Sequence, residues 1–311
     1  MELSNEYKAK LDELLNGYKL SVLKEASFSI IDSYHQDKKD KPVIDSDLKA
    51  KIYAVTRMPA TYKAVSEVFE HTFELYNPNI DIALDIGAGL GAASRALSDL
   101  HEVKHINLYE KEEAMRKLGM SINLDKPVLY HEFDLTKDKI EDKYDLVMSS
   151  YVLNEIDESI RKEVILKMFN ATNDLLVIVE PGTPNGYKII MEVRKALKNS
   201  GAHIVAPCPN IVNCPMKNSD WCHFATRVQR TKLHKALKEG ESPFEDEKYT
   251  YIVFSKKADF KCESRVLRHP IINKGLIKLT TCSKEGINEI EIRKSHPKFK
   301  MAKKIKVGDS F

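Results

Sequence analysis

The sequence predicts an α/β protein built on a doubly wound, mostly parallel sheet, with a helical segment before it and a small β-rich module after it. Two observations support this fold class. From about residue 80, short apolar runs alternate with helical patterns. A glycine-rich stretch, GAGLGA, then separates the first apolar run from the first of these helices, as in Rossmann-like sheets.

Residues 1–75 predict an N-terminal helical domain, because apolar residues recur there every three or four positions. Residues 76–257 predict the sheet domain. Its first strands are IALDIG, INLYE, VLYHEF, YDLVMSS and LLVIVEP, and its helices include AASRALSDL, EEAMRKLG and ESIRKEVILKMFN. A helix KIIMEVRKALKNSG, a strand HIVAP and a closing strand TYIVFSK follow. A cysteine-rich insert lies near residues 207–245, and residues 258–311 predict the β-rich module.

The composition is that of a soluble globular protein, with 42% hydrophobic and 31% charged residues and a net charge of +3. No apolar run reaches the roughly 18 residues that span a bilayer. The first residues include acids and lack the apolar core of a signal peptide. We therefore expect a cytoplasmic monomer without a membrane partner. In that compartment thiols stay reduced, so five cysteines favour metal or redox chemistry over disulfides.

The glycine loop is the first candidate site. Gly87, Gly89 and Gly91 follow the first strand, where glycines allow close approach of a ligand to the backbone and to a helix N-terminus. Glu110 ends the second strand, 21 residues after Gly89, where a carboxylate can bind ribose hydroxyls. These features fit either a dinucleotide or S-adenosylmethionine.

Two further acids favour S-adenosylmethionine. Asp85 precedes the first glycine by two positions and could serve the cationic methionine end of the ligand. Asp134 follows the third strand and could contact the adenine. A dinucleotide site and a vestigial, empty site remain alternatives.

The segment after the fourth strand, SYVLNEI, identifies no catalytic base. It lacks the Asn/Asp-Pro-Pro-aromatic motif of base aminomethylases, and no cysteine follows the fourth or fifth strand for attack on a pyrimidine. The sequence therefore leaves open whether the protein is an enzyme.

Three cysteines, Cys208, Cys214 and Cys222, lie within fifteen residues. The gaps of five and seven residues between them are wider than the two to four residues of a zinc knuckle. With a distant fourth thiolate from Cys262 or Cys282, the set suits an iron–sulfur cluster, which four cysteines commonly hold. Zinc and unmetallated thiols are the alternatives.

These segments resemble the methyltransferase-like family associated with the small ribosomal subunit, found in bacteria and mitochondria. The matching stretches are RMPATY, the glycine loop, EPGTPNG, CPNIVNCP, DWCHFATRVQRTKLH and EDEKYTYIVFSK. The resemblance implies a class I methyltransferase fold that carries a 4Fe–4S cluster and acts in small-subunit assembly. It also implies that the fourth ligand is Cys282, within LTTCSKEG, which leaves Cys262 as a free buried thiol.

A basic surface completes the prediction. The segment RVQRTKLHKALKEG predicts a helix that carries Arg227 and Arg230. The tail adds four further cations: Lys298, Lys300, Lys303 and Lys304. We expect both to contact phosphates of small-subunit rRNA. The leading hypothesis is an S-adenosylmethionine-binding, iron–sulfur protein that acts on or binds this RNA. The alternative is a non-catalytic assembly factor that uses ligand and metal structurally. A radical enzyme is disfavoured, because such enzymes use a tighter C-x3-C-x2-C loop.

Overall fold

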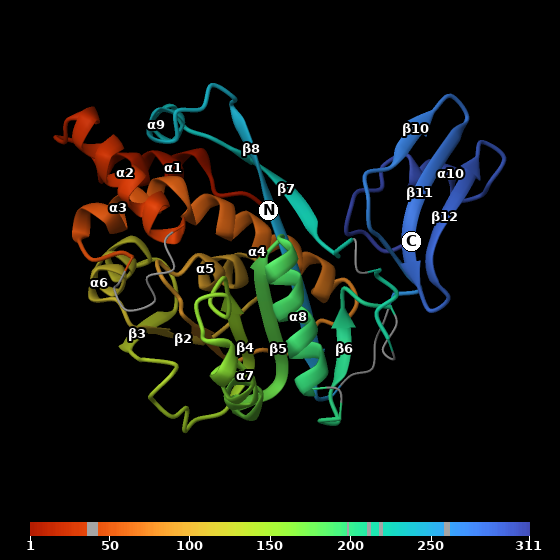
Figure 1. Cartoon of the computed structure of the whole chain (residues 1–311), viewed down its shortest axis with the longest axis horizontal. Helices are drawn as coiled ribbons and strands as arrows, with labels where there is room; N and C mark the ends of the chain where they lie inside the picture. The colour runs from red at the N-terminus through yellow and green to blue at the C-terminus, as the bar shows by residue number, and fades with distance from the viewer. Residues whose placement is uncertain (36–42, 198, 210–212, 218–219, 258–261) are drawn as a thin grey trace.

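The computed structural model describes residues 1–35, 43–197, 199–209, 213–217, 220–257 and 262–311. Its centre is a large sheet to which eight strands of the described chain contribute (Figure 1). In spatial order they are β3 (Val128–Glu132), β2 (His105–Glu110), β1 (Ile82–Ile86), β4 (Tyr144–Ser150), β5 (Thr172–Pro181), β8 (Phe244–Ser255) and β6 (His203–Ala206), with β7 (Phe224–Gln229) also paired to β8.

The strand order identifies the fold. Strands β3, β2, β1, β4 and β5 are parallel, whereas β8 runs antiparallel to both β5 and β6. This is the order of the class I methyltransferase, Rossmann-like sheet, so the predicted fold class is confirmed. The order reverses between β1 and β4, and sheets of this kind bind ligands at the carboxyl ends of the strands at that point.

Helices cover both faces of the sheet. They are α1 (Asn5–Glu13), α2 (Leu20–His35), α3 (Asp47–Thr56), α4 (Met58–Phe73), α5 (Ala92–Leu100), α6 (Glu113–Ile122), α7 (Glu158–Ala171), α8 (Pro184–Leu197) and the short α9 (Lys232–Leu237). Along β5, Val177 and Val179 join the core under the first six helices, and Leu176 and Ile178 join the core under α7 and α8. This alternation follows from the two-residue period of a strand buried on both faces.

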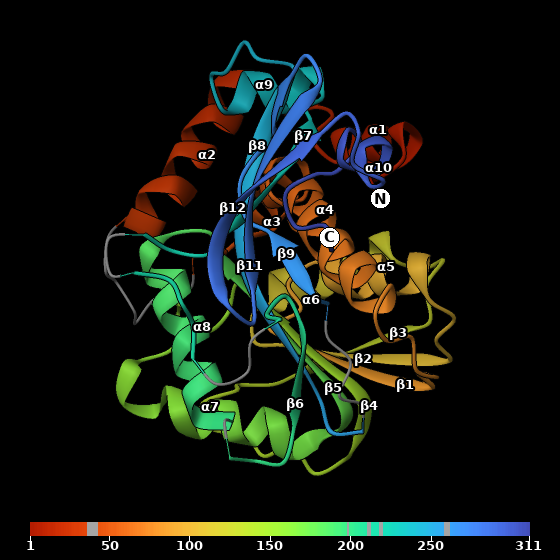
Figure 2. The same ribbon diagram turned by 90° about the vertical axis from the view of Figure 1, so that its right-hand side faces the viewer.

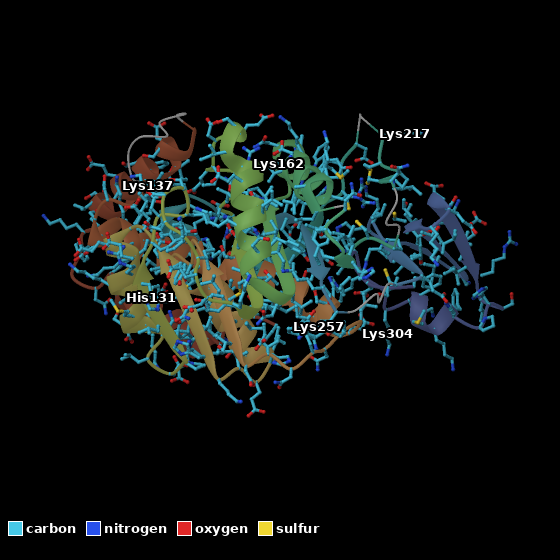
Figure 3. All side chains as sticks on the ribbon, turned by 90° about the horizontal axis from the view of Figure 1, so that it is seen from below. His131, Lys137, Lys162, Lys217, Lys257 and Lys304 are labelled. Carbon is cyan, nitrogen blue, oxygen red and sulfur yellow. The ribbon has the colours of Figure 1, made fainter. Side chains whose placement is uncertain are left out.

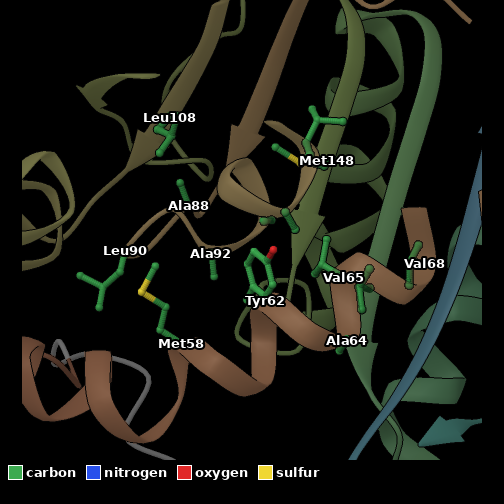
Figure 4. Close-up of a cluster of buried hydrophobic side chains, with 14 of the residues drawn as sticks. Met58, Tyr62, Ala64, Val65, Val68, Ala88, Leu90, Ala92, Leu108 and Met148 are labelled. Atoms are coloured by element: carbon green, nitrogen blue, oxygen red, sulfur yellow. The ribbon is translucent and has the colours of Figure 1, made fainter. Parts of the chain in front are cut away.

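The N-terminal helices pack directly on the cofactor-binding half of the sheet. On α4, Met58 and Tyr62 lie near Ala92 of α5, in one buried cluster with Val65 and Ala88 (Figure 4). At the start of α4, both terminal guanidinium nitrogens of Arg57 lie 3.1–3.2 Å from the Glu247 carboxylate on β8. Residues 1–75 therefore share one core with the sheet.

The segment from Phe224 to Gln229 corrects one prediction. Arg227 was expected on a helix, but it lies on β7, and the helix α9 begins only at Lys232. Phe224, Thr226 and Val228 are buried while the residues between them are more exposed, which is the alternation of a strand. Pairing with β8 outweighs the helix propensity of Arg and Gln in this stretch.

The C-terminal module lies at the side of the molecule away from β3, and in the turned view its strands lie in front of the large sheet (Figures 1 and 2). It contains β9 (Ser264–Val266), β10 (Ile271–Asn273), β11 (Leu276–Ser283), β12 (Gly286–Arg293) and α10 (Phe299–Ala302). Val266, Ile277 and Ile292 form its core with Phe299 and Ile305 of the basic tail. The tail is thus part of the module, as well as a carrier of charge.

Candidate cofactor cleft and cysteine cavity

The glycine loop joins β1 to α5, and two of its glycines are sterically required. Gly87, Gly89 and Gly91 all have positive φ, at 64°, 52° and 78°. A Cβ atom at Gly87 would lie 2.4 Å from Val152 Cγ2, and one at Gly91 would lie 2.9 Å from the Tyr130 hydroxyl. Gly89 is less crowded, and its backbone N–H is used by the acid described next.

Glu110 lies at the carboxyl end of β2, as predicted, and holds the glycine loop. Its Oε2 accepts a hydrogen bond from Gly89 N at 2.7 Å, and its Oε1 accepts one from Glu112 N at 2.8 Å. Burial raises the pKa of Glu110, although these N–H bonds oppose the shift. Each carboxylate oxygen can accept a second bond, so a ribose hydroxyl could still bind there.

Asp85 lies below the loop. It is fully buried, and its Oδ2 accepts bonds from Ser94 N at 3.2 Å and Ser94 Oγ at 2.8 Å at the start of α5. Its Oδ1 has no hydrogen-bond partner in the described part of the chain. Burial raises the pKa of Asp85 to about 7, although the Ser94 bonds oppose the shift. One oxygen therefore anchors α5, and the other is left for a donor that a ligand could supply.

Asp134 follows β3 at the same edge of the sheet. Its Oδ1 accepts bonds from Thr136 N at 3.0 Å and Thr136 Oγ1, and Lys111 Nζ lies 3.3 Å from Oδ2. Although partial burial opposes it, these contacts lower the pKa of Asp134 to about 2. The carboxylate is therefore ionised and half-buried at the place expected for an adenine contact.

Glu180 lies at the end of β5. It is fully buried, and its carboxylate accepts bonds from Leu153 N at 2.9 Å and Asn154 N at 3.2 Å. Burial outweighs these bonds and, with the charge of Glu155, raises the pKa of Glu180 to about 8. Glu180 thus fixes the loop after β4, which forms one wall of the cleft.

Glu155 belongs to the same loop and is exposed to solvent. Although part of Glu155 reaches solvent, its carboxyl group is partly surrounded by neighbouring residues. This loss of solvation, together with the charges of Glu110 and Glu112, raises the pKa of Glu155 to about 7. Asp85, Glu110, Glu155 and Glu180 are therefore a group of acids at the strand ends whose pKa values are all raised. The sequence identified two of them as cofactor residues. The roles of the other two depend on how the loop after β4 folds.

The second site is a cavity between the large sheet and the C-terminal module. Cys208, Cys214, Cys222 and Cys282 all line it, and its empty space is about 580 Å³ including the part open to solvent. Cys208 follows β6, Cys222 precedes β7, and Cys282 lies on β11 of the module. The structure therefore brings together the four predicted metal ligands. Within the described ranges, no three His, Cys, Asp or Glu side chains are grouped as ligands of a metal ion.

The thiols lie in largely apolar surroundings and influence one another electrostatically. Burial, opposed by the Arg194 guanidinium, raises the pKa of Cys208 to about 11. Burial and the neighbouring thiols raise the pKa of Cys282 to about 12, and the same causes raise the pKa of Cys222 well above its usual value. Because metal binding requires thiolates, these sulfurs would ionise only with a metal or cluster among them.

Arg265 supplies positive charge at the same cavity. It is 1% exposed and lies opposite Cys282 in the β9–β11 pairing. Its Nε donates to Pro207 O at 3.1 Å and its Nη1 to Gly308 O at 2.7 Å. Its Nη2 is buried without a hydrogen-bond partner among the residues that the structure describes. A buried cation with a spare donor, beside four cysteines, fits an anionic thiolate-bound centre.

Cys262 and His223 do not line the cavity, and Cys262 is the buried thiol that the family resemblance left over. Cys262 is buried and its Sγ lies 3.8 Å from Pro207 O, but it does not line the cavity. His223 does not line the cavity either, and its ring stacks on Trp221 at 5.3 Å. The fit to the predicted ligand set is therefore to four cysteines without histidine.

The predicted RNA contacts divide into two groups. The tail lysines 298, 300, 303 and 304 are exposed, and Lys304 projects from the module in Figure 3. Arg227 is exposed but pairs with Asp246 at 2.9 Å. Arg230 lies after β7, outside any helix, and is largely buried in an ion pair with Glu245 at 2.9 Å. The guanidinium of Arg230 is therefore not free to bind a phosphate.

Comparison with known protein families shows which family this chain belongs to. Residues 47–311 match the family described as mitochondrial small ribosomal subunit Rsm22. The chain belongs to this family. Among curated relatives, the human "Ribosome assembly protein METTL17, mitochondrial" is 24% identical over 197 residues, covering 56% of this chain and 42% of the relative. The fission yeast "Rsm22-cox11 tandem protein 2, mitochondrial" is 22% identical and covers 99% of this chain and 49% of the relative.

The relatives differ from this chain in length, and they correct its expected location. The chain spans about half the length of the curated relatives it matches or less. They also overturn the expected cytoplasmic location, since the family and both relatives are described as mitochondrial. The absence of a recognisable leader in the first residues was not sufficient to infer a compartment. The described part of the chain contains no helix long and apolar enough to cross a membrane.

Solved methyltransferases are similar to this chain at greater distance. The magnesium protoporphyrin IX methyltransferase of Synechocystis PCC 6803, with bound S-adenosylmethionine, is 13% identical with a TM-score of 0.44 and covers 83% of this chain and all of that one. The N-methyltransferase NodS of Bradyrhizobium japonicum, bound to S-adenosyl-L-homocysteine, is 11% identical with a TM-score of 0.44, and the match covers 74% of this chain and all of NodS. Likenesses this distant say nothing about the substrate of this chain.

Proposed function

We propose that this protein binds S-adenosylmethionine in the glycine-loop cleft, carries a 4Fe–4S cluster in the cysteine cavity, and acts as a monomer on small-subunit rRNA during ribosome assembly. The observation that carries the proposal is the cavity itself. Four cysteines from two parts of a methyltransferase-like fold line one space, in a chain of the Rsm22 family. The human relative METTL17 is named as a ribosome assembly protein, which supports a role in ribosome assembly.

The cleft favours a cationic ligand. Burial, together with repulsion from neighbouring acids, raises the pKa values of Asp85, Glu110, Glu155 and Glu180, and one oxygen of Asp85 has no partner among the described residues. S-adenosylmethionine carries a sulfonium and an ammonium group, which would relieve this repulsion. A dinucleotide would instead bring negatively charged phosphates to the same acids, which disfavours that alternative.

The charge of the cleft predicts a pH dependence of binding. We expect the affinity for S-adenosylmethionine to rise about tenfold between about pH 6 and about pH 8, because carboxyl groups with pKa values of about 7 in the free protein must ionise next to the cation. Binding should therefore release protons, which calorimetry in buffers of different ionisation enthalpy measures. The control ligand 5′-methylthioadenosine has no positive charge and should show little dependence. Equal pH profiles for the two ligands would contradict this account.

For the metal centre, Cys208, Cys214, Cys222 and Cys282 would be the ligands, and Arg194 and Arg265 would be cations lining the same cavity. The cluster would supply four metal–thiolate bonds that join β6, the insert and β11. Zinc is the alternative, but a single zinc ion needs sulfurs that converge within a few ångströms. The gaps of five and seven residues between Cys208, Cys214 and Cys222 are wider than those of a zinc knuckle, which favours the larger cluster.

The RNA contact follows from charge. Residues 262–311 hold twelve lysines and arginines against five acids, whereas the whole chain has a net charge of only +3. Positive charge is therefore concentrated in the module that the cysteine cavity joins to the sheet. The exposed tail lysines are suited to phosphates, which give affinity without sequence readout. We retain Arg227 in this surface and leave out the buried Arg230.

Substituting the tail lysines tests the RNA surface. Replacing Lys298, Lys300, Lys303 and Lys304 by Gln should weaken binding to small-subunit rRNA and to unrelated RNAs alike. Each lost duplex phosphate contact should flatten the log–log salt dependence by about 0.9. Deletion of the tail is a poorer test, because Phe299, Ala302 and Ile305 belong to the module core. The matched control replaces four exposed lysines elsewhere: Lys10, Lys117, Lys137 and Lys162. An unchanged slope in the tail variant, or an equal change in the control, would show that the surface is wrongly placed.

A second candidate function is a non-catalytic assembly factor. The loop after β4 favours it, because this loop offers few groups for catalysis. The Glu180 carboxylate already accepts bonds from two backbone N–H groups, and Glu155 is the exposed acid of the segment Tyr151–Glu155. The two candidates differ in one observable. Only an enzyme leaves a methyl group on small-subunit rRNA that disappears from a deletion strain, which mass spectrometry of that RNA detects.

A further inference from the structure

The cysteine cavity and the cofactor cleft use the same two strands. Glu180 on β5 holds the cleft loop through Leu153 N and Asn154 N. Its cross-strand partner on β8 is Thr250, which lines the cysteine cavity. One residue of each site therefore belongs to the same cross-strand pair of β5 and β8.

Trp221 makes a second connection. It directly precedes Cys222, and its indole Nε1 donates to Gly182 O at 3.0 Å. Gly182 is buried one residue beyond the end of β5 and donates its N–H to Lys248 O at 2.9 Å. A Cβ atom on Gly182 would lie 2.7 Å from the Lys248 and Tyr249 backbone. Displacement of Trp221 would therefore be transmitted to the end of β5, two residues from Glu180.

Tyr187, which lies on α8 and lines the cysteine cavity, makes a third connection. Its hydroxyl lies 3.3 Å from Cys214 Sγ, and it belongs to α8, whose first residue is two positions after Gly182. In the turn between them, Gly186 N donates to Thr183 Oγ1 at 3.1 Å. Both ends of the short segment 182–187 thus contact residues of the cysteine loop.

We propose that Trp221 and Tyr187 are positioning residues that couple the two sites, so that metal loading of the cysteines strengthens binding of S-adenosylmethionine. The coupling rests on the proposed function, since it needs both ligands. Bound thiolates would fix Cys214 and Cys222, and through Tyr187 and Trp221 they would fix residues 180–187. Glu180 then holds the loop after β4 in its binding conformation. By linkage, the cofactor would in turn stabilise the loaded metal centre by the same factor.

The experiment compares the affinity for S-adenosylmethionine of anaerobically purified, metal-loaded protein with that of the same protein after treatment with an iron chelator and a thiol reductant. We expect loading to increase affinity by about 5- to 150-fold, the usual range of coupling between sites. Hydrogen exchange at residues 151–156 should be faster in the unloaded protein. Loaded protein that fails to bind S-adenosylmethionine would refute the proposed cofactor, whereas equal affinity of the two forms would refute only the coupling.

Two variants locate the connection. Trp221→Phe keeps an aromatic ring but removes the N–H donor to Gly182, and Tyr187→Phe removes the contact with Cys214. Each should retain iron and reduce the effect of loading towards onefold. The matched control, Tyr76→Phe, removes a 2.8 Å bond to Asp174 at the opposite end of β5 and should leave the effect unchanged. If Trp221→Phe loses iron, Tyr187→Phe decides the question. A full loading effect in every variant that retains iron would overturn the roles of both residues.

Discussion

Protein purified without oxygen is expected to be brown and to contain close to four iron and four sulfide per chain, because four thiolates of one cavity would bind one cluster. Cys282→Ser should lose this iron. It should also expose the C-terminal module to proteolysis, because Cys282 is the only one of the four ligands that lies on the module. Iron and sulfide assays and limited proteolysis measure the two effects.

Cys262→Ser is the matched control for this loss. Cys262 is buried next to the cavity without lining it, so its replacement should leave iron and sulfide unchanged. A colourless preparation with stoichiometric zinc would contradict the cluster but not the clamp between sheet and module. Loss of iron in Cys262→Ser but not in Cys282→Ser would mean that the fourth ligand is wrongly assigned.

Glu110→Ala is expected to weaken S-adenosylmethionine binding by roughly 1.5–3 kcal/mol, the usual cost of losing hydrogen bonds to a charged group. That is about a 10- to 150-fold loss of affinity, which calorimetry measures. The carboxylate acts twice, as an acceptor for ribose hydroxyls and as the group that fixes Gly89 N and Glu112 N. Removing it would therefore loosen the glycine loop as well as the ligand contact.

Glu110→Gln separates these two roles. The amide oxygen can still accept from Gly89 N, whereas the amide NH2 group cannot accept from Glu112 N. One of the two loop bonds is therefore kept while the charge is lost, and binding should weaken less than in the alanine variant. RNA binding should be unaffected in both variants, because Glu110 lies far in sequence and fold from the basic module. Unaltered affinity of Glu110→Ala for S-adenosylmethionine, or tighter binding of NAD, would refute the cleft as described.

The sequence by itself determined the α/β sheet and the glycine loop, and it predicted a ligand chemistry that stays a prediction. Buried parallel strands are nearly continuous apolar runs, so IALDIG and LLVIVEP identify themselves without tertiary information. Gly87 and Gly91 are needed for their backbone conformation and for local crowding, which a turn between strand and helix implies. The cysteine spacing, with the family resemblance, led to the four residues that line one cavity.

Only the tertiary structure decided how these parts meet. Strand β7 is short and contains Arg and Gln, which favour helices, so local propensity predicts the wrong element. Pairing with β8 makes this segment a strand. The same pairing places Arg230 against Glu245, a contact between residues 15 apart that no local pattern indicates. Glu180 and Trp221 acquire their roles in the same way. Their partners, Leu153 and Gly182, lie 27 and 39 residues away, and only the packed sheet brings them within hydrogen-bonding distance.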